Sequence, residues 1–293
     1  LVLVNRSSLL WRQGRLDAAT EDAAEGLAIF RSLGMKGLAA FALNSLGISL
    51  SSSGRFEDAI ACVRASIVLD REAGDRMHVG RKASNVGQLY AELGDVERAV
   101  EFMERALVVF ENVDDPPARA DTLAALAEVR IEQEGDLGRA ESALDEAERI
   151  ASRLGDRSDL AHTRLVRSEL ARVRGQLDVS ASLAKEAAAD ARAAGTVAYE
   201  VLALARLAAS LAALGQSGEA LEAADRVEQL LGSRGALERN ERVELALARA
   251  FASLGEPERA ARAQEAARAS VNVRARGIGD PELRRRYLEH PIA

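Results

Sequence analysis

The sequence predicts an all-α protein built from repeated helical hairpins, and three observations carry this prediction. The 293 residues include 58 alanines but only 3% aromatic residues and 5 prolines, a composition that favours helices. A glycine followed five residues later by a small residue recurs seven times. Another small residue precedes most of these glycines by seven or eight positions. A β-sandwich or barrel would need aromatic and β-branched residues with frequent turns, so the composition excludes all-β folds and disfavours α/β folds.

The repeat has a period of 40 residues. Successive turn glycines are separated by 40, 40, 41, 40, 40 and 40 positions, and an apolar periodic stretch flanks each of them. A glycine at this place supplies the positive φ that ends the first helix of a hairpin. The seven turn glycines are Gly14, Gly54, Gly94, Gly135, Gly175, Gly215 and Gly255.

Small residues at the predicted helix crossings explain the excess of alanine. Gly47 and Gly87 lie seven positions before a turn glycine, and Ala59 and Ala99 lie five positions after one. Side chains of this size let the two helices of a hairpin approach closely. The high alanine content and the repeat are therefore one feature of the sequence.

A second set of glycines lies at the junctions between repeats. These are Gly34, Gly74, Gly155, Gly195 and Gly235. The junction between the third and fourth repeats instead reads Asp114-Asp115-Pro116-Pro117. An aspartate cap followed by proline is a good helix start, so we interpret this segment as a variant loop. Because the period continues across it, we do not expect a domain boundary there.

Residues 87–107 carry a resemblance to the tetratricopeptide repeat (TPR). They combine Gly87-Gln88-Leu89-Tyr90 with the turn at Gly94 and with Ala99 and Ala106 on the following helix. The fifth repeat departs from this pattern, since Ser180 replaces the alanine. The resemblance covers residues 1–270. It implies a right-handed α-solenoid of seven helix-turn-helix repeats, followed over residues 271–293 by a C-terminal loop and a capping helix.

The 40-residue period resembles the regulatory TPR arrays of bacterial signalling proteins. These include kinesin-light-chain-like arrays, arrays of signal-transduction ATPases and transcription activators, and arrays fused to Ser/Thr kinases. The resemblance implies a cytoplasmic module of a larger bacterial signalling protein. The first residue, Leu1 rather than methionine, agrees with this expectation.

The sequence offers no motif for catalysis. It has no P-loop, its histidines lie in different repeats, and the lone Cys62 has no partner for a disulfide. We therefore expect no catalytic residue, no cofactor and no metal. The net charge of −7 disfavours nucleic acid as a partner, and no apolar stretch is long enough to suggest a membrane span.

The expected partner is a protein or a peptide, including an attached kinase or ATPase domain. In a TPR array the first helix of each repeat lines the concave face, at positions 13, 10, 6 and 3 before the turn glycine. The candidate binding residues at such positions are Phe41, Asn44, Ile48, Arg81, Ser84, Gln88, Asp121, Glu128, His162, Leu165, Glu169 and Arg172. Apolar residues take these positions in the sixth and seventh repeats, among them Leu202, Ala209 and Leu245. That apolar wall suits a docked helix, and the closing helix at 281–289 is a candidate to fill it.

The stretch 149–174 holds seven arginines against three acids. It suits either an acidic partner or ion pairs with acids on neighbouring helices, and we favour ion pairs. For the whole chain we favour a protein-interaction module. The alternatives are a sensor of a small ligand or signal peptide, and an RNA-binding repeat protein. The charge and the 40-residue period disfavour the RNA-binding alternative.

Overall fold

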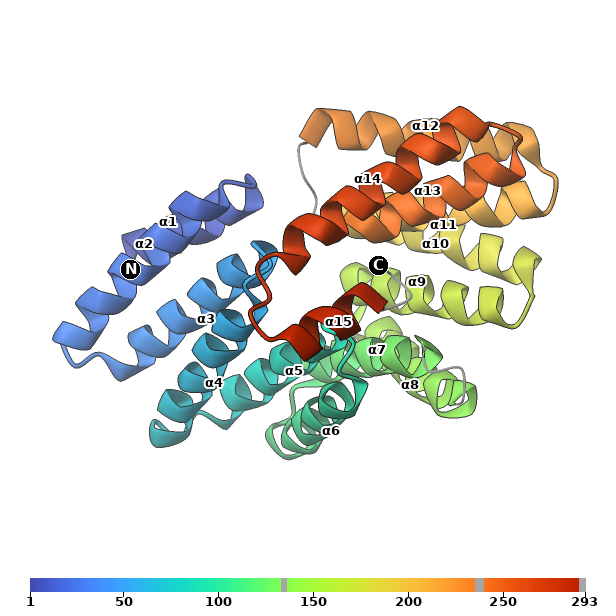
Figure 1. Cartoon of the computed structure of the whole chain (residues 1–293). Helices are drawn as coiled ribbons and strands as arrows, with labels where there is room; N and C mark the ends of the chain where they lie inside the picture. The colour runs from blue at the N-terminus through green and yellow to red at the C-terminus, as the bar shows by residue number, and fades with distance from the viewer. Residues whose placement is uncertain (133–135, 235–239, 290–293) are drawn as a thin grey trace. The chain divides into compact units, whose positions relative to one another are not determined.

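The computed structural model describes residues 1–132, 136–234 and 240–289, which form fifteen α-helices and no strand (Figure 1). Consecutive helices form the expected hairpins, α1 with α2 through α13 with α14. The helices are α1 (Val2–Arg12), α2 (Leu16–Ser32), α3 (Lys36–Ser52), α4 (Phe56–Glu72), α5 (Arg76–Glu92), α6 (Val96–Val113), α7 (Pro116–Glu132), α8 (Leu137–Leu154), α9 (Arg157–Val173), α10 (Leu177–Ala194), α11 (Val197–Ala213), α12 (Ser217–Arg234), α13 (Asn240–Ser253), α14 (Pro257–Ala275) and α15 (Pro281–Glu289).

The turn glycines have the conformation that the sequence predicts. In the six turns that the structure describes, their φ angles lie between +72° and +77°. Gly135 and Gly235 lie outside the described residues. At the variant junction, α6 is capped by Asp114, which has a left-handed φ of 53°, and α7 starts at Pro116 as predicted.

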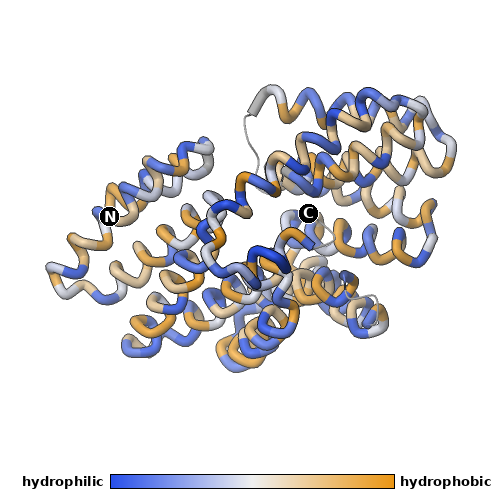
Figure 2. The backbone as a smooth tube through the Cα atoms, in the orientation of Figure 1, coloured by the Kyte–Doolittle hydropathy of each residue, from blue (hydrophilic) through white to orange (hydrophobic). Residues whose placement is uncertain are grey.

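The hairpins are closely packed where the sequence places small residues. A Cβ atom on Gly47 would lie 2.7 Å from Cγ2 of Val63, and one on Gly87 would lie 2.7 Å from Cγ of Met103. Ala59 is fully buried. Figure 2 shows apolar and polar residues interleaved along the helices, as one-sided burial of a helix requires. The small residues therefore set the close approach that the repeat pattern indicates.

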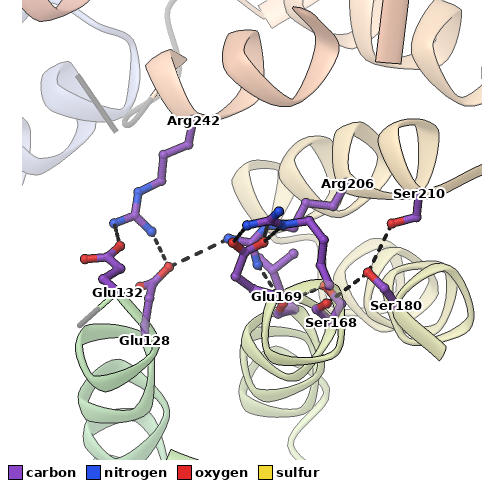
Figure 3. Close-up of polar contacts among 10 residues, drawn as sticks. Glu128, Glu132, Ser168, Glu169, Ser180, Arg206, Ser210 and Arg242 are labelled. Atoms are coloured by element: carbon purple, nitrogen blue, oxygen red, sulfur yellow. Dashed lines mark hydrogen bonds and ion pairs between the residues drawn. The ribbon is translucent and has the colours of Figure 1, made fainter. Parts of the chain in front are cut away.

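Ser180 takes the place of the expected alanine in the fifth repeat, and it forms a buried hydrogen-bonded chain with Ser168 and with Ser210 of the sixth repeat. The Ser180 hydroxyl donates to the backbone oxygen of Ser168 at 2.9 Å. The Ser210 hydroxyl, 3.0 Å from that of Ser180, must then donate to it (Figure 3). Because each hydroxyl has a partner, this departure from the repeat pattern leaves no polar group unsatisfied at the crossing.

The chain divides into two compact units. The first comprises Leu1–Asp115 together with residues 272–289, and the second comprises Pro116–Val271. The division falls at the Asp-Asp-Pro-Pro junction, while the single repeat array expected from the sequence stays a prediction. Pro116 and Pro117 have no amide hydrogen to donate to the preceding turn, so α6 cannot continue through them.

The C-terminal segment packs on the second and third repeats, within the first unit. Ile278 is fully buried, and the ring of Tyr287 lies 5.7 Å from that of Phe56. Nη2 of Arg274 lies 2.6 Å from the Glu92 carboxylate. Helix α15 belongs to the first unit and the wall of the sixth and seventh repeats to the second, so the expectation that α15 fills this wall stays a prediction. In α15, Tyr287 packs on Phe56 of α4, and Nη1 of Arg286 lies 3.7 Å from Asp95, the residue before α6.

Candidate functional site

A groove lies on the first helices of the fourth to seventh repeats, all in the second unit. Helices α7, α9, α11 and α13 line it, and it encloses about 180 Å³. We call it the α7–α13 groove. Its charged lining residues are Glu128, Glu132, Glu169, Arg172, Arg206, Arg242 and Arg249. Its apolar lining residues are Ile131, Val173, Leu202, Ala209, Leu245 and Ala246. Residues at intervals of three and four positions lie on one face of a helix, which explains how the repeat gathers them.

Arg242 connects the fourth and seventh repeats across this groove. Figure 3 shows its guanidinium, from α13, between two carboxylates of α7. It forms ion pairs with Glu128 and, at 3.3 Å, with Glu132. The side chains of Arg242 and Glu128 are only 13% and 14% exposed. A pair so shielded from water interacts more strongly than an ion pair on the surface, and losing one partner leaves a charge that water solvates poorly.

Glu169 lies between two guanidinium groups in the same groove. Arg172 donates two hydrogen bonds to it, at 3.0 and 2.6 Å. Nε of Arg206 lies 3.8 Å from the same carboxylate, and a nitrogen of Arg206 lies 3.9 Å from Glu128. Arg206 also donates to the backbone oxygen of Leu165 at 2.6 Å. The network therefore extends over α7, α9, α11 and α13.

The positive charges dominate the electrostatics of the groove. Burial raises the pKa of Glu169, but Arg206, Arg172 and Arg249 outweigh it and lower this pKa to about 2. The pKa of Arg249 is lowered by burial and by the like charges of Arg172 and Arg206, against the opposite effect of Glu169. Both shifts have the sign expected of a site with a surplus of positive charge.

The Glu169 carboxylate should make the stability of the fold depend on acid pH. Its pKa in the folded state, about 2, lies below the ordinary value of 4.5, so its contribution is complete above pH 4.5 and disappears as the pH falls toward 2. We expect a loss of about 3 kcal/mol in unfolding free energy over this range from this group. Urea unfolding at several pH values should show a shallower acid dependence for Glu169→Gln. Identical pH slopes in the two proteins would contradict this assignment.

Three of the twelve candidate binding residues lie in the groove, namely Glu128, Glu169 and Arg172, together with Leu202, Ala209 and Leu245 of the expected apolar wall. Two other candidate residues contact each other across α7 and α9. Nδ1 of His162 lies 3.1 Å from the Asp121 carboxylate. The ring of His162 stacks on that of Tyr199, at 5.1 Å between centroids. Nearly equivalent positions of adjacent repeats are therefore in contact at this point, and the concave-face role of these residues stays a prediction.

Asp159, one turn before His162, has an unusual protonation equilibrium. Burial, with the like charges of Asp156 and Asp121, raises its pKa to about 7, and His162 opposes this rise. One of its carboxylate oxygens, Oδ2, is buried without a hydrogen bond among the described residues. The cluster therefore differs from the groove, where arginines lower the pKa of Glu169.

The remaining predicted residues are not gathered into the groove. Leu165 packs in the hydrophobic core of the second unit, and Ser84 is buried in the first, so we do not extend the proposal of partner contact to them. Arg81 makes a paired contact with Asp115, at 2.7 and 2.9 Å. Phe41 is exposed, whereas Asn44, Ile48 and Gln88 are half-buried on the first unit.

Sequence reasoning missed three arginines of the groove. Arg242 and Arg249 occupy positions 13 and 6 before Gly255, so the positional rule used for the earlier repeats would have found them. Arg206 lies outside those four positions, but it interrupts the most apolar stretch of the chain, residues 201–214. A charge in such a stretch needs a partner, and this signal indicates a buried ion pair.

The arginine-rich stretch 149–174 is engaged in ion pairs with neighbouring helices, which confirms the interpretation that we favoured. Arg157 and Arg164 both pair with Asp190 of α10. Arg167 lies 2.8 Å from Asp145 of α8. The stretch therefore does not present a row of unpaired arginines to an acidic partner.

The remaining observations concern metal binding, the reactivity of Cys62 and membrane-spanning helices. In the part of the chain that the structure describes, no three His, Cys, Asp or Glu side chains are grouped so as to hold a metal ion. The half-buried Cys62 has a raised pKa, because burial and Asp58 disfavour its thiolate. Its nucleophilicity at neutral pH is correspondingly low. Among the described helices, none combines the length and the apolar character needed to cross a membrane.

Comparisons with known proteins agree with this architecture. The fold is all-α and like that of tetratricopeptide-like helical solenoids. Residues 79–153 match the family model described as tetratricopeptide repeat, which covers the segment where the sequence resemblance is clearest. The matched model describes a helical repeat and indicates no family of enzymes. A comparison with curated protein sequences found no match.

The chain is also similar in fold to several solved structures. A Rap protein complexed with competence and sporulation factor is 15% identical, with a TM-score of 0.64 over 98% of this chain and 95% of that one. NprR in complex with its cognate peptide NprX is 15% identical, with a TM-score of 0.63 over 97% and 84%. A tetratricopeptide repeat protein from Parabacteroides merdae is 17% identical, with a TM-score of 0.56 over 98% and 97%.

Proposed function

We propose that this chain is a non-catalytic regulatory module that binds a peptide in the α7–α13 groove. The observation that carries the proposal is the composition of the groove, in which four successive repeats supply seven charged and six apolar side chains. Recognition of an extended peptide uses this combination, because apolar side chains bind apolar groups while polar ones satisfy the peptide backbone and its charges. Two proteins of similar fold, a Rap protein and NprR, are described as complexes with a factor and with a cognate peptide.

The size of the groove favours a peptide over a small metabolite. Pockets for small molecules typically enclose about 300–1,000 Å³. The α7–α13 groove encloses about 180 Å³, enough for a few side chains of a longer ligand that continues outside it. The ion pairs across the groove also hold its walls in place before binding, which lowers the entropic cost of association.

A second candidate function is a sensor of a small apolar ligand. A separate groove in the first unit, between α2, α3 and α4, encloses about 440 Å³ and favours this candidate. Phe30, Leu43 and Leu69 contribute apolar surface to it, while Met35 and Val68 are 44% and 52% exposed. Its volume lies in the range of small-molecule pockets. Thermal stabilisation by a small apolar compound that is lost in Leu43→Glu would support this candidate.

The wider role follows from the resemblance to bacterial signalling arrays. Binding of the peptide would regulate an attached kinase, ATPase or transcription-activator domain in the cytoplasm. The net charge of −7 supports a protein or peptide partner over nucleic acid.

The test is selection of binding peptides from a random synthetic hexapeptide mixture with the full chain. We expect a defined set of peptides to be retained. Ala209→Trp fills the groove with an indole ring and should abolish their retention. Ala213→Trp is the matched control, because Ala213 is an exposed residue of the same helix outside the groove. Retention of the same peptides by both variants would show that they bind elsewhere.

A further inference from the structure

We infer that the α7–α13 groove selects peptides in which an acidic side chain stands between aliphatic ones. This inference rests on the proposed function and specifies its ligand. It follows from the charges that line the groove and from the level along the helices at which each side chain lies.

The groove holds one more positive charge than it can neutralise. Its lining includes four arginines and three glutamates. Each glutamate has a guanidinium nitrogen within 4.0 Å, supplied by Arg242, Arg206 or Arg172. The fourth guanidinium, that of Arg249, forms neither an ion pair nor a hydrogen bond with any residue that the structure describes. A ligand therefore meets a surplus of one positive charge, located at Arg249.

A carboxylate matches this surplus better than other charged groups. It carries one negative charge and accepts two parallel hydrogen bonds from a guanidinium. A phosphate would bring a charge of about −1.5 to −2, which exceeds the surplus and would repel the three glutamates. A lysine or arginine in the ligand would add to the positive charge. The charge balance thus favours an Asp or Glu side chain.

Measured along the helix axes, the apolar lining residues lie both above and below the position of Arg249. Arg249 is six positions before its turn glycine, whereas Leu245 and Leu202 are ten and thirteen positions before theirs. Val173 is two positions before its own. Because equivalent helices of successive repeats run in the same direction, these offsets place apolar surface about one turn (Leu245) and two turns (Leu202) to one side of the guanidinium and about one turn (Val173) to the other. An acidic residue with aliphatic neighbours on both sides fits this arrangement. A peptide that presents its C-terminal carboxylate to Arg249 would contact the apolar surface on only one side.

The experiment uses the hexapeptides selected from the random synthetic mixture by the full chain. We expect enrichment of sequences with an internal Asp or Glu flanked by Leu, Ile or Val. In the most enriched peptide, Asp→Asn or Glu→Gln should weaken binding about tenfold or more, in line with loss of a charge-assisted hydrogen bond. Amidation of the C-terminus should change affinity less than twofold.

Arg249→Gln should remove this discrimination, so that the acidic peptide and its amide analogue bind the variant equally. Arg153→Gln is the control, because Arg153 is an exposed arginine of α8 that does not line the groove. It should keep the tenfold preference. Thermal unfolding of each variant shows that the fold is retained.

The outcomes separate this inference from the proposed function. Selected peptides that depend on Ala209 but show no acidic preference, or an Arg249→Gln variant that still prefers the acid, would overturn the inference and leave the proposed function standing. A strong effect of C-terminal amidation would assign the recognised carboxylate to the chain end and would also overturn it. Peptide binding that Ala209→Trp does not disturb would overturn both.

Discussion

Replacing Glu128 with alanine is expected to lower the unfolding free energy of the protein by about 3 kcal/mol. Glu128 is the carboxylate that Arg242 of α13 and Arg206 of α11 share, and all three side chains are 13% or 14% exposed. Its loss leaves two guanidinium groups close together with less compensating charge and with little access to water. Urea unfolding at neutral pH measures the effect.

Glu141 offers the matched control for this experiment. It also pairs with an arginine, Arg174, at 2.9 Å, but the two side chains are 46% and 30% exposed. Its replacement by alanine should cost less than about 1 kcal/mol, as for other surface ion pairs. A double-mutant cycle of Glu128→Ala with Arg242→Ala should give a coupling energy of about 1–3 kcal/mol. A coupling near zero would mean that the pair across the groove does not stabilise the fold.

Replacing Gly54 with alanine is expected to cost about 3 kcal/mol, whereas replacing Gly74 should cost about 1 kcal/mol. Both glycines have a positive φ, +77° and +75°, which an alanine adopts only with strain. A Cβ on Gly74 would meet nothing within 4 Å, but one on Gly54 would lie 2.6 Å from the backbone oxygen of Arg274. The difference between the two variants therefore reports the docking of the C-terminal segment.

Hydrogen exchange of α15 distinguishes this account from a general loss of stability. Gly54→Ala should raise exchange in residues 281–289, because the added methyl group displaces the segment that holds them. Gly74→Ala should leave their exchange unchanged. Equal exchange of α15 in both variants would show that the contact at Gly54 does not hold the C-terminal segment.

The repeat architecture could be predicted from the sequence because each local sequence signal favours the same helical hairpin. Gly94 ends a helix, Gly87 and Ala99 permit a close crossing, and the interval of 40 residues repeats the arrangement. These signals depend only on neighbours in the sequence or on the partner helix. The docking of Tyr287 on Phe56 depends on a contact between segments 231 residues apart, and no periodicity encodes it.

The candidate site was only partly predictable for a similar reason. The helical period placed Glu128, Glu169 and Arg172 on the face that lines the groove, since their positions follow from the turn glycines. The partnership of Glu128 with Arg242 joins residues 114 positions apart. It depends on the small rotation of each repeat relative to the one before it. These rotations accumulate over four repeats, and the sequence pattern does not specify them. The burial of Leu165 likewise depends on how closely α9 and α11 approach.

The most direct test of the proposed binding site is hydrogen–deuterium exchange of the full chain with and without a selected hexapeptide. The expected result is slower exchange in segments 128–132, 169–173, 202–209 and 242–249, with no change in residues 30–43 and 65–69. Protection confined to residues 30–43 and 65–69, which line the groove of the first unit, would contradict the account and assign binding to that groove instead.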